Sequence, residues 1–485
     1  MIKFLLRGEF MFETIIDTIN TFLYSKLLIV ILIGSGIYFT IRTRFPQVRL
    51  FRKACNAVME KPEGKESVSS FQALMVSTAS RVGTGNIVGV SSAICIGGVG
   101  SVFWMWIIAI LGSASALAES TLAQIYKKKG EDGRCYGGPA YYIEAALHSR
   151  GLAVVFCIAM ILTYAFGFNM LASYNLQSTF AGQPFYNADI TPWIIGGILA
   201  LVMGWCLLGG GNRIVKVTST LVPFMGIAYI LVSLLVVVLN IGQLPSVMAQ
   251  IFKEAFDFKA IFAGFAGSAM MQGIRRGLYS NEAGIGSAPN AAASAVVSHP
   301  VKQGLVQMLS VFIDTLLLCT ATAMMCLVSG VIPAKELQGA PWVQAALHKT
   351  LGSFGPYFIM IAMVLFAFTT LLGNCFYCDN LLTYIHKKQP DRKFMTGFRI
   401  VSALAVFWGA GMEMTLLWHI SDVLMGVMAL INIPVILILS NTVVKALKDY
   451  EIQIQQKKNP VFFSKNIDLK QKTDYWNDGL LLSCL

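Results

Sequence analysis

One stretch of the chain interrupts an apolar segment of membrane length with residues that weaken a helix. Residues 80–89 read SRVGTGNIVG and hold three glycines, an arginine and an asparagine. Because glycine costs a helix about 1 kcal/mol relative to alanine, Gly83 and Gly85 predict an unwound turn. In a bilayer, unpaired N–H and C=O groups survive only inside protein or beside a cavity. The stretch therefore predicts a site for an ion or a small solute, as in a transporter.

The composition places this stretch in a membrane protein. Of the 485 residues, 56% are hydrophobic and only 13% are charged, whereas soluble domains carry roughly 25% charged residues. The net charge of +12 does not predict nucleic-acid binding, because the basic residues cluster between apolar runs. The ten cysteines show neither metal-ligand spacing nor a disulfide framework. The lipid bilayer is the expected partner.

Apolar segments long enough to cross a bilayer predict an all-α membrane protein with eleven transmembrane helices. They cover residues 22–45, 72–95, 101–126, 152–180, 192–208, 214–241, 260–289, 304–330, 354–382, 395–412 and 415–445.

Lysine and arginine counts predict the orientation of these spans. With the N-terminus outside, the inner segments hold 27 of these residues and the outer segments hold 7. Cytoplasmic loops carry the excess of positive charge. We therefore expect a multi-pass protein of the cell membrane with its N-terminus outside and its C-terminus in the cytoplasm.

Eleven spans divide into one additional helix and two halves of five, which must enter the membrane in opposite directions. Glycines interrupt the first span of each half, at residues 83–85 and at residues 273–277. Broken segments at matching positions of inverted repeats point to the site of a secondary transporter. Alternatively, such glycines serve only close helix packing. The expected organisation is an outer N-terminal segment (1–21), an additional transmembrane helix (22–45), a basic cytoplasmic linker (46–71), the first repeat (72–241), an external loop (242–259), the second repeat (260–447) and a polar, flexible cytoplasmic tail (448–485).

Four ordered motifs resemble those of the sodium:alanine symporter family, also called alanine/glycine:cation symporters. They read VGTGNI at 82–87, GGVGSVFWMW at 97–106, GGPAYYI at 137–143 and RGLYSNEAGIGSAP at 276–289. The resemblance implies a LeuT-type fold with one extra N-terminal helix, and import of a small neutral amino acid with sodium. Residues 173–177 read SYNLQ, where members of the family often carry a Gln-Ala-Asn run. Alanine or glycine is the expected substrate, with serine and glutamine as alternatives.

A zwitterionic amino acid needs partners for a carboxylate and for an ammonium group, both of which are costly to desolvate. The exposed N–H groups at the start of a half-helix suit the carboxylate, and free carbonyl and amide oxygens suit the ammonium. The candidate substrate ligands are Gly83, Thr84, Gly85 and Asn86 at the first interruption, and Met271, Gln272 and Gly273 at the second. Gln272 could equally form a helix–helix hydrogen bond.

Sodium prefers oxygen ligands, by the logic that governs hard cations. Thr369 and Thr370 lie in the middle of an apolar span. The resemblance implies that their hydroxyls bind sodium with the carbonyls of Ala79 and Val82, and a second ion could use the amide of Asn86. The alternative is that both hydroxyls bond the preceding turn of their own helix.

Charged residues inside a membrane span indicate function by default. We expect Glu282 to pair with Arg81 or Arg276 in a cytoplasmic gate, or else in a permanent ion pair between the halves. Asp314 is either a cation or proton ligand or a structural acceptor.

Proton coupling through Asp314 or Glu282 is the main alternative to sodium coupling. An enzyme is not expected, because the sequence shows no HExxH motif and no clustered His/Asp or Ser/Lys set. Residues 137–143 are expected to form a short helix across the cytoplasmic entrance. The sequence does not indicate an oligomeric state.

Overall fold

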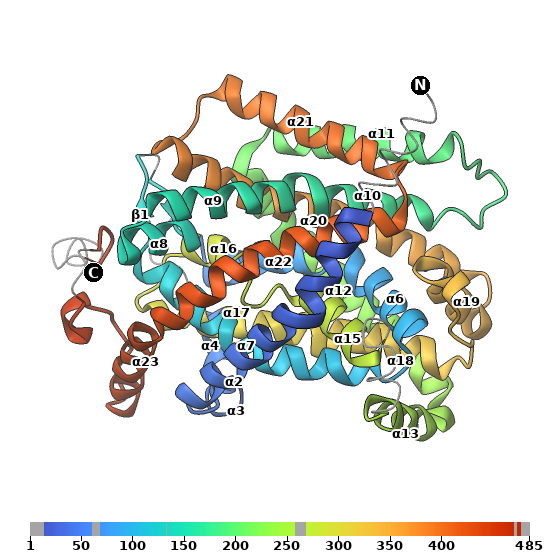
Figure 1. Ribbon diagram of the computed structural model, residues 1–485, viewed down its shortest axis with the longest axis horizontal. Helices are drawn as coiled ribbons and strands as arrows, with labels where there is room; N and C mark the ends of the chain where they lie inside the picture. Colours follow the sequence, from blue (N-terminus) through green and yellow to red (C-terminus); the bar gives the residue numbers. More distant parts are fainter. Residues whose placement is uncertain (1–13, 61–67, 132, 258–267, 470–472, 477–485) are drawn as a thin grey trace.

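The computed structural model describes residues 14–60, 68–131, 133–257, 268–469 and 473–476. Most long helices run across Figure 1 in roughly the same direction. Helices α8 (Pro139–Leu147) and α23 (Ser440–Gln455) lie at one end, and α13 (Leu244–Ala255) and α19 (Ala340–Leu351) at the other. We call these the α23 end and the α13 end. Two parts of the predicted organisation lie outside the described residues. They are residues 1–13 of the N-terminal segment and residues 260–267 at the start of the second repeat.

Among the described residues, six helical segments are long and apolar enough to cross a membrane. They are Ser101–Ile125 (α7), Arg150–Ser178 (α9, η3 and α10), Gly210–Leu239 (α12), Pro300–Val328 (α17, η6 and α18), Phe354–His386 (α20) and Met414–Ile438 (α22). Three shorter apolar helices are Ile29–Arg42 (α2), Thr84–Gly97 (η2 and α6) and Thr191–Leu207 (α11). The helical membrane fold is confirmed, whereas the count of eleven spans stays a prediction.

The remaining elements are short or peripheral. They are the π-helix η1 (Leu23–Leu28), α3 (Pro46–Arg49), α4 (Phe51–Val58), the 3₁₀ helices η4 (Ile241–Gln243), η7 (Lys335–Leu337) and η8 (Ser464–Ile467), and α21 (Arg392–Ala410). One antiparallel hairpin, β1 (Lys128–Lys129) with β2 (Cys135–Tyr136), joins α7 to α8. Helix α8 includes most of residues 137–143, where a short helix was expected.

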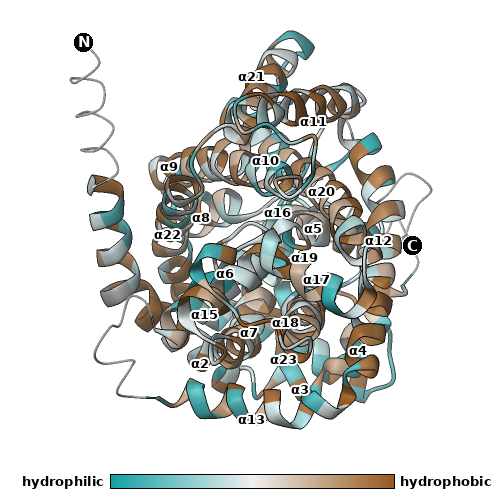
Figure 2. Ribbon diagram, turned by 90° about the vertical axis from the view of Figure 1, so that its right-hand side faces the viewer, coloured by the Kyte–Doolittle hydropathy of each residue, from teal (hydrophilic) through white to brown (hydrophobic). Residues whose placement is uncertain are grey.

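Apolar side chains cover the outside of the helix bundle. Leu201 on α11 is 75% exposed and Phe224 on α12 is 68% exposed. In Figure 2, hydrophobic residues dominate peripheral helices such as α11, α12 and α21, and the central helices are paler. Apolar surface on this scale needs a lipid covering.

The first predicted interruption is present. Helix α5 (Ser70–Arg81) begins at a capping box between Ser69 and Gln72 and ends before Val82. Gly83 is extended, the 3₁₀ turn η2 covers Thr84–Asn86, and α6 (Val88–Gly97) resumes the span. The backbone of this span is therefore unwound at the glycines.

The second interruption lies elsewhere, and its predicted position at residues 273–277 is wrong. Helix α15 (Ala269–Asn281) runs without a break through Gly273 and Gly277. A Cβ atom at Gly273 would lie 2.4 Å from the carbonyl oxygen of Ser101, and one at Gly277 would lie 2.6 Å from Ile108. These glycines allow α15 to approach α7 closely, which is the packing use of a Gly-x-x-x-Gly stripe.

The real break separates α15 from α16 (Pro289–Ser294). Glu282 adopts a left-handed conformation, as do Gly284 and Gly286. Glycine adopts positive φ without steric cost, and Pro289 suits the first turn of a new helix. The second half therefore does begin with a broken span, but the break comes after Asn281.

The C-terminal tail is not a free end over its described part. Phe462 and Trp476 are fully buried, and their rings lie 5.2 Å apart. The indole N–H of Trp476 donates to the carbonyl of Gln124 on α7 (2.7 Å). The expectation of a flexible tail is wrong here because these aromatic side chains dock on the α23 end.

Candidate functional site

The side chain of Asn86 closes the first break. Its amide oxygen accepts a hydrogen bond from the backbone N–H of Gly83 (2.8 Å), and the Asn86 N–H donates to the Gly83 carbonyl (3.2 Å). These two bonds fix a compact turn in place of helical hydrogen bonds. Backbone groups of the turn that Asn86 does not engage can face a ligand.

Three neighbouring helices contact the first break. The amide of Asn175 on α10 donates to the Thr84 hydroxyl (3.0 Å). A Cβ atom at Gly83 would lie 2.0 Å from the Thr370 hydroxyl on α20, and one at Gly85 would lie 2.6 Å from the Tyr279 ring on α15. Each glycine is needed here because a neighbouring side chain occupies the place of its own.

Asn86 also connects the first break to the second repeat. Its amide N–H₂ donates to a carboxylate oxygen of Asp314 (2.7 Å) and to the hydroxyl of Ser280 (3.1 Å). Ser280 donates to the other Asp314 oxygen (2.7 Å), as does Thr315 (2.8 Å). Asp314 lies in the π-helix η6 (Phe312–Cys319), and π-helical turns occur frequently at functional sites.

The carboxylate of Glu119 bonds the loop of the second break. The two oxygens of Glu119 on α7 accept the backbone N–H groups of Gly284 (3.2 Å) and Gly286 (3.1 Å). The amide of Asn432 on α22 donates to Glu119 (2.8 Å) and to the Gly284 carbonyl (2.9 Å). The loop is therefore fixed by polar contacts from both sides.

Three buried carboxylates and one buried guanidinium lie around the two breaks. Arg81 interacts electrostatically with Glu119, Glu282 and Asp314. All four side chains are at most 2% exposed. None of the three guanidinium nitrogens of Arg81 has a hydrogen-bond partner among the described residues. Glu119, Glu282 and Asp314 thus share Arg81 as a basic neighbour, while Arg276 lies against Asp422.

The predicted gate residues do not all meet. Glu282 accepts hydrogen bonds from Ser287 (2.6 Å) and from Ser80 (3.2 Å), the residue before Arg81. Arg276 instead forms an ion pair with Asp422 on α22 (2.8 Å) and lies 3.9 Å from the Trp418 ring. The expected pairing of Glu282 with Arg276 is therefore wrong, because a carboxylate 146 residues away in sequence holds the guanidinium.

Met271, Gln272 and Gly273 lie in the first turns of α15. The Gln272 side chain packs beside Gly97, and Gly273 packs against Ser101. Gly273 precedes the second break by about 13 Å at the rise of an α-helix. Met271, Gln272 and Gly273 were expected to bind the ammonium group of the substrate through free carbonyl oxygens. Their backbone carbonyls lie in a continuous helix instead.

The predicted sodium ligands lie at the crossing of α5 and α20. Thr370 faces Gly83, and its buried hydroxyl has no hydrogen-bond partner in the described part of the chain. The Thr369 hydroxyl donates to the Leu365 carbonyl of its own helix (2.9 Å). Ala79 and Val82 are fully buried on α5 and at its end. Thr370 is thus the better placed of the two hydroxyls for an ion.

Sequence reasoning missed Tyr279 and Asp422. The Tyr279 ring packs against Phe168 and Trp418 at centroid distances of 4.8 Å and lies over Gly85. Tyr279 lies within the motif at 276–289, and Asp422 is an isolated carboxylate in an apolar span, which was the available signal. Asn175 lies in the stretch that departs from the family pattern, and its contact with Thr84 places it at the first break.

Comparison with known proteins shows the family of this chain. The model of the sodium:alanine symporter family matches residues 9–464. The chain belongs to this family. It is a multi-pass membrane transporter and not an enzyme.

Two curated relatives from Bacillus subtilis match along almost their whole length. The amino-acid carrier protein AlsT is 43% identical over 471 residues, covering 97% of this chain and 99% of AlsT. The probable sodium/glutamine symporter GlnT is 42% identical over 467 residues, covering 96% of both chains. A structure of MhsT in complex with L-phenylalanine shares the fold with a TM-score of 0.58 at 14% identity, covering 80% of this chain and 93% of MhsT. The likeness shows the LeuT-type fold.

Proposed function

We propose that this transporter imports a small neutral amino acid, alanine or glycine, together with sodium. The substrate binds at the first break, and access alternates between the two sides of the membrane. The N-terminus lies outside and the C-terminus lies in the cytoplasm.

The observation that carries this proposal is the unwound backbone between α5 and α6. Residues 82–87 leave the helix in the centre of the bundle, where Asn175, Tyr279 and Thr370 face them. Gly83, Thr84, Gly85 and Asn86 would bind the carboxylate of the substrate. Half-helix ends at mid-membrane offer such anion sites in secondary transporters.

Tight packing around the break favours a small substrate. Thr370 fills the face of Gly83 and Tyr279 fills the face of Gly85. A large substrate side chain would have to displace the rings of Tyr279, Phe168 and Trp418. Serine is the nearest alternative by size, and glutamine is an alternative because GlnT is named for it.

The excess of buried carboxylates favours a cation as the coupled ion. Uncompensated buried charge costs several kcal/mol per ion. If Glu119, Glu282 and Asp314 are all ionised, they need more positive charge nearby than Arg81 alone provides. We assign sodium to a site formed by the Thr370 hydroxyl and the carbonyls of Ala79 and Val82. The Thr369 hydroxyl would be a further ligand only if it gave up its hydrogen bond to the Leu365 carbonyl. We also retain Arg81 and Glu282 as the gate, because Glu282 already contacts the residue beside Arg81.

The test of this proposal is uptake of labelled alanine by proteoliposomes. We expect uptake to require an inward sodium gradient and to be inhibited by unlabelled alanine and glycine more than by glutamine. Replacing sodium by choline should abolish uptake. Uptake that persists in choline and follows a proton gradient would support the second candidate, proton coupling at Asp314, a fully buried carboxylate within a membrane span.

Thr370 tests the sodium assignment separately from the substrate. Thr370→Ala should raise the sodium concentration for half-maximal uptake at least about fivefold, since a lost ligand in a buried site costs about 1–3 kcal/mol. Thr370→Ser keeps the hydroxyl and should remain close to the wild type. Thr163→Ala removes a buried hydroxyl that bonds its own helix and is the control. Unchanged sodium dependence in Thr370→Ala would contradict the assignment.

A further inference from the structure

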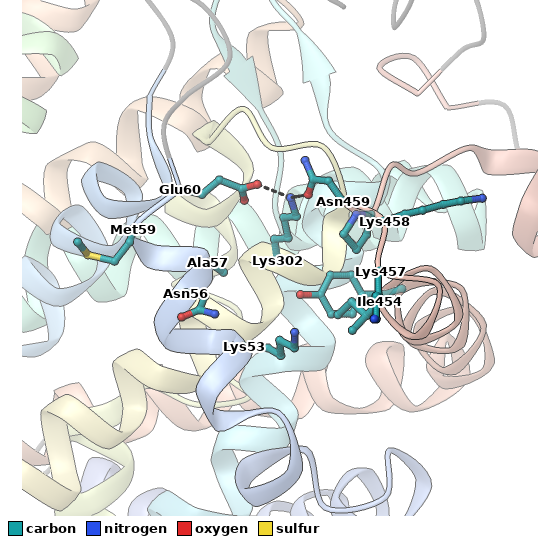
Figure 3. Close-up of a pocket in the computed structure, with 12 residues that line it drawn as sticks. Lys53, Asn56, Ala57, Met59, Glu60, Lys302, Ile454, Lys457, Lys458 and Asn459 are labelled. Atoms are coloured by element: carbon teal, nitrogen blue, oxygen red, sulfur yellow. Dashed lines mark hydrogen bonds and ion pairs between the residues drawn. The ribbon is translucent and has the colours of Figure 1, made fainter.

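A basic groove opens at the α23 end, away from both breaks. Its volume is about 450 Å³, and it lies between α4, the start of α17 and the chain that follows α23. Figure 3 shows Lys53 and Asn56 on α4 on one side, Lys457 and Ile454 on the other, and Lys302 between them. Residues of the linker at 46–71 and of the tail at 448–485 thus meet at one cavity.

Lys302 fixes the walls of this groove. Its ammonium group donates to Glu60, to Ser298 (2.7 Å) and to Asn459 (2.8 Å). An ammonium group has three N–H donors, and all three of Lys302 are engaged. Glu60, the carboxylate that lines the groove, is already paired with Lys302. The groove is therefore a built cavity rather than a gap between mobile side chains.

Lys53 and Lys457 line the groove without a carboxylate partner among the described residues. The nearby acids on α23 are already engaged, since Asp449 contacts His299 (3.1 Å) and Glu451 contacts Arg49 (2.7 Å). Like charges from two separate segments repel each other. Their approach is favourable when an anion lies between them.

The helix pair α3 and α4 places this groove at the membrane surface. Val48 is 81% exposed and Met59 is 80% exposed, on a segment that also carries Arg49, Arg52 and Lys53. A short amphipathic segment with exposed apolar and basic side chains lies in the plane of the lipid interface. The anion that reaches the groove most readily is therefore part of a lipid.

We propose that the groove binds the phosphate headgroup of an anionic phospholipid such as phosphatidylglycerol. Lys53 and Lys457 neutralise the phosphate, and Asn56 and Asn459 supply hydrogen-bond donors to the headgroup. Basic pockets beside membrane helices recognise anionic headgroups in this way. The proposal goes beyond the transport function and does not depend on the identity of the substrate.

The test is lipid binding to the purified full-length protein, measured by native mass spectrometry with phosphatidylglycerol and with phosphatidylcholine. We expect retained phosphatidylglycerol adducts, and a dissociation constant raised at least about tenfold in Lys53→Gln/Lys457→Gln, because each lysine near the surface contributes roughly fivefold. Both side chains are exposed, so the thermal stability of the variant should match the wild type.

The matched control is Lys387→Gln/Lys388→Gln, which removes two exposed lysines from the connection between α20 and α21. It should bind phosphatidylglycerol as the wild type does. Equal binding by the groove variant, or an equal loss in the control, would overturn the site. Displacement of the lipid by millimolar inorganic phosphate would show a site for soluble anions and overturn the choice of a lipid.

Discussion

Asn86 shows how one side chain can link the two halves of the site. It caps Gly83 in the first repeat and donates to Asp314 and Ser280 in the second. A movement of either repeat therefore changes the hydrogen bonds of the broken backbone. Coupling between a cation and a substrate requires such shared contacts, because each ligand must favour the same conformation.

Glu282 offers a residue-level test of the gate. Glu282→Gln removes a charge that interacts with Arg81 and keeps the size of the side chain. Its amide oxygen can still accept from Ser287, and its NH2 group can donate to the Ser80 hydroxyl in place of accepting from it. We expect a reduced rate of uptake with substrate affinity changed by less than about twofold, since Glu282 does not contact the first break. Uptake rate and equilibrium binding of labelled alanine measure the two effects, with Glu131→Gln on an exposed turn as the control.

A loss of substrate affinity equal to the loss of rate would contradict the gate and place Glu282 in the binding pocket. Sequence reasoning identified Glu282 and Arg81 as charged residues within spans. It could not assign the partner of Arg276, because Asp422 reaches it only through the packing of α15 beside α22.

At the scale of elements, glycine has two uses that look alike in a sequence. Gly83 accompanies a true break, whereas Gly273 and Gly277 serve close packing against α7. The second break is marked instead by Gly284 and Gly286 with positive φ, followed by Pro289. The existence of a broken span in each half was predictable, but its position in the second half depended on a helix contact that only the fold reveals.

Gly273→Ala tests this distinction. A methyl group there would clash with the Ser101 backbone and the Trp104 side chain, so we expect a destabilisation of about 1–3 kcal/mol and a lower Tm in detergent. Gly397→Ala on α21, where the new methyl group would point into open space, is the control and should not lower the Tm. A raised Tm for Gly273→Ala would indicate that α15 is unwound there after all.

His299 caps α17 in a way that depends on pH. Its Nδ1 accepts the Val301 N–H (3.2 Å), which leaves the Nε2–H to donate to Asp449 (3.1 Å). Burial lowers the pKa of His299 below its ordinary value of 6.5, with a smaller contribution from Lys302, while Asp449 opposes the shift. A protonated Nδ1 could not accept the Val301 bond.

The lowered pKa means that the unfolded chain binds the proton first, so stability is complete above pH 6.5 and falls as the pH drops below it. His299→Asn keeps a capping side chain but does not titrate. We expect the Tm of the variant to decrease less than that of the wild type as the pH is lowered. Thermal unfolding across a pH series measures this difference. Parallel curves for the two proteins would refute a role for His299.

At the scale of the whole molecule, the C-terminal tail closes the α23 end. It contacts α7 through Trp476, the start of α17 through Ser298, and α23 through Lys445. The backbone of Val296, which follows α16, also bonds Val68 before α5. The tail therefore packs at the end of the bundle where the chain enters α5 and leaves α16, the outer parts of the two broken spans.

Trp476→Ala should destabilise the protein by about 3–5 kcal/mol, the cost of removing a fully buried tryptophan. The tail also covers Lys127, whose pKa burial lowers to about 8, and Tyr475 lies 3.9 Å from its ammonium group. The Tm in detergent measures the loss, and Trp205→Ala at a 68% exposed position should have little effect. Equal Tm values for Trp476→Ala and the wild type would show that the tail does not contribute to stability.

The most direct test of the central claim is a cryo-electron microscopy structure of the protein with sodium and alanine bound. We predict alanine density against the backbone of Gly83–Asn86, a cation beside the Thr370 hydroxyl, and an unwound chain between α5 and α6. A continuous helix across Gly83, or alanine bound beside Met271 and Gly273 instead, would contradict the account.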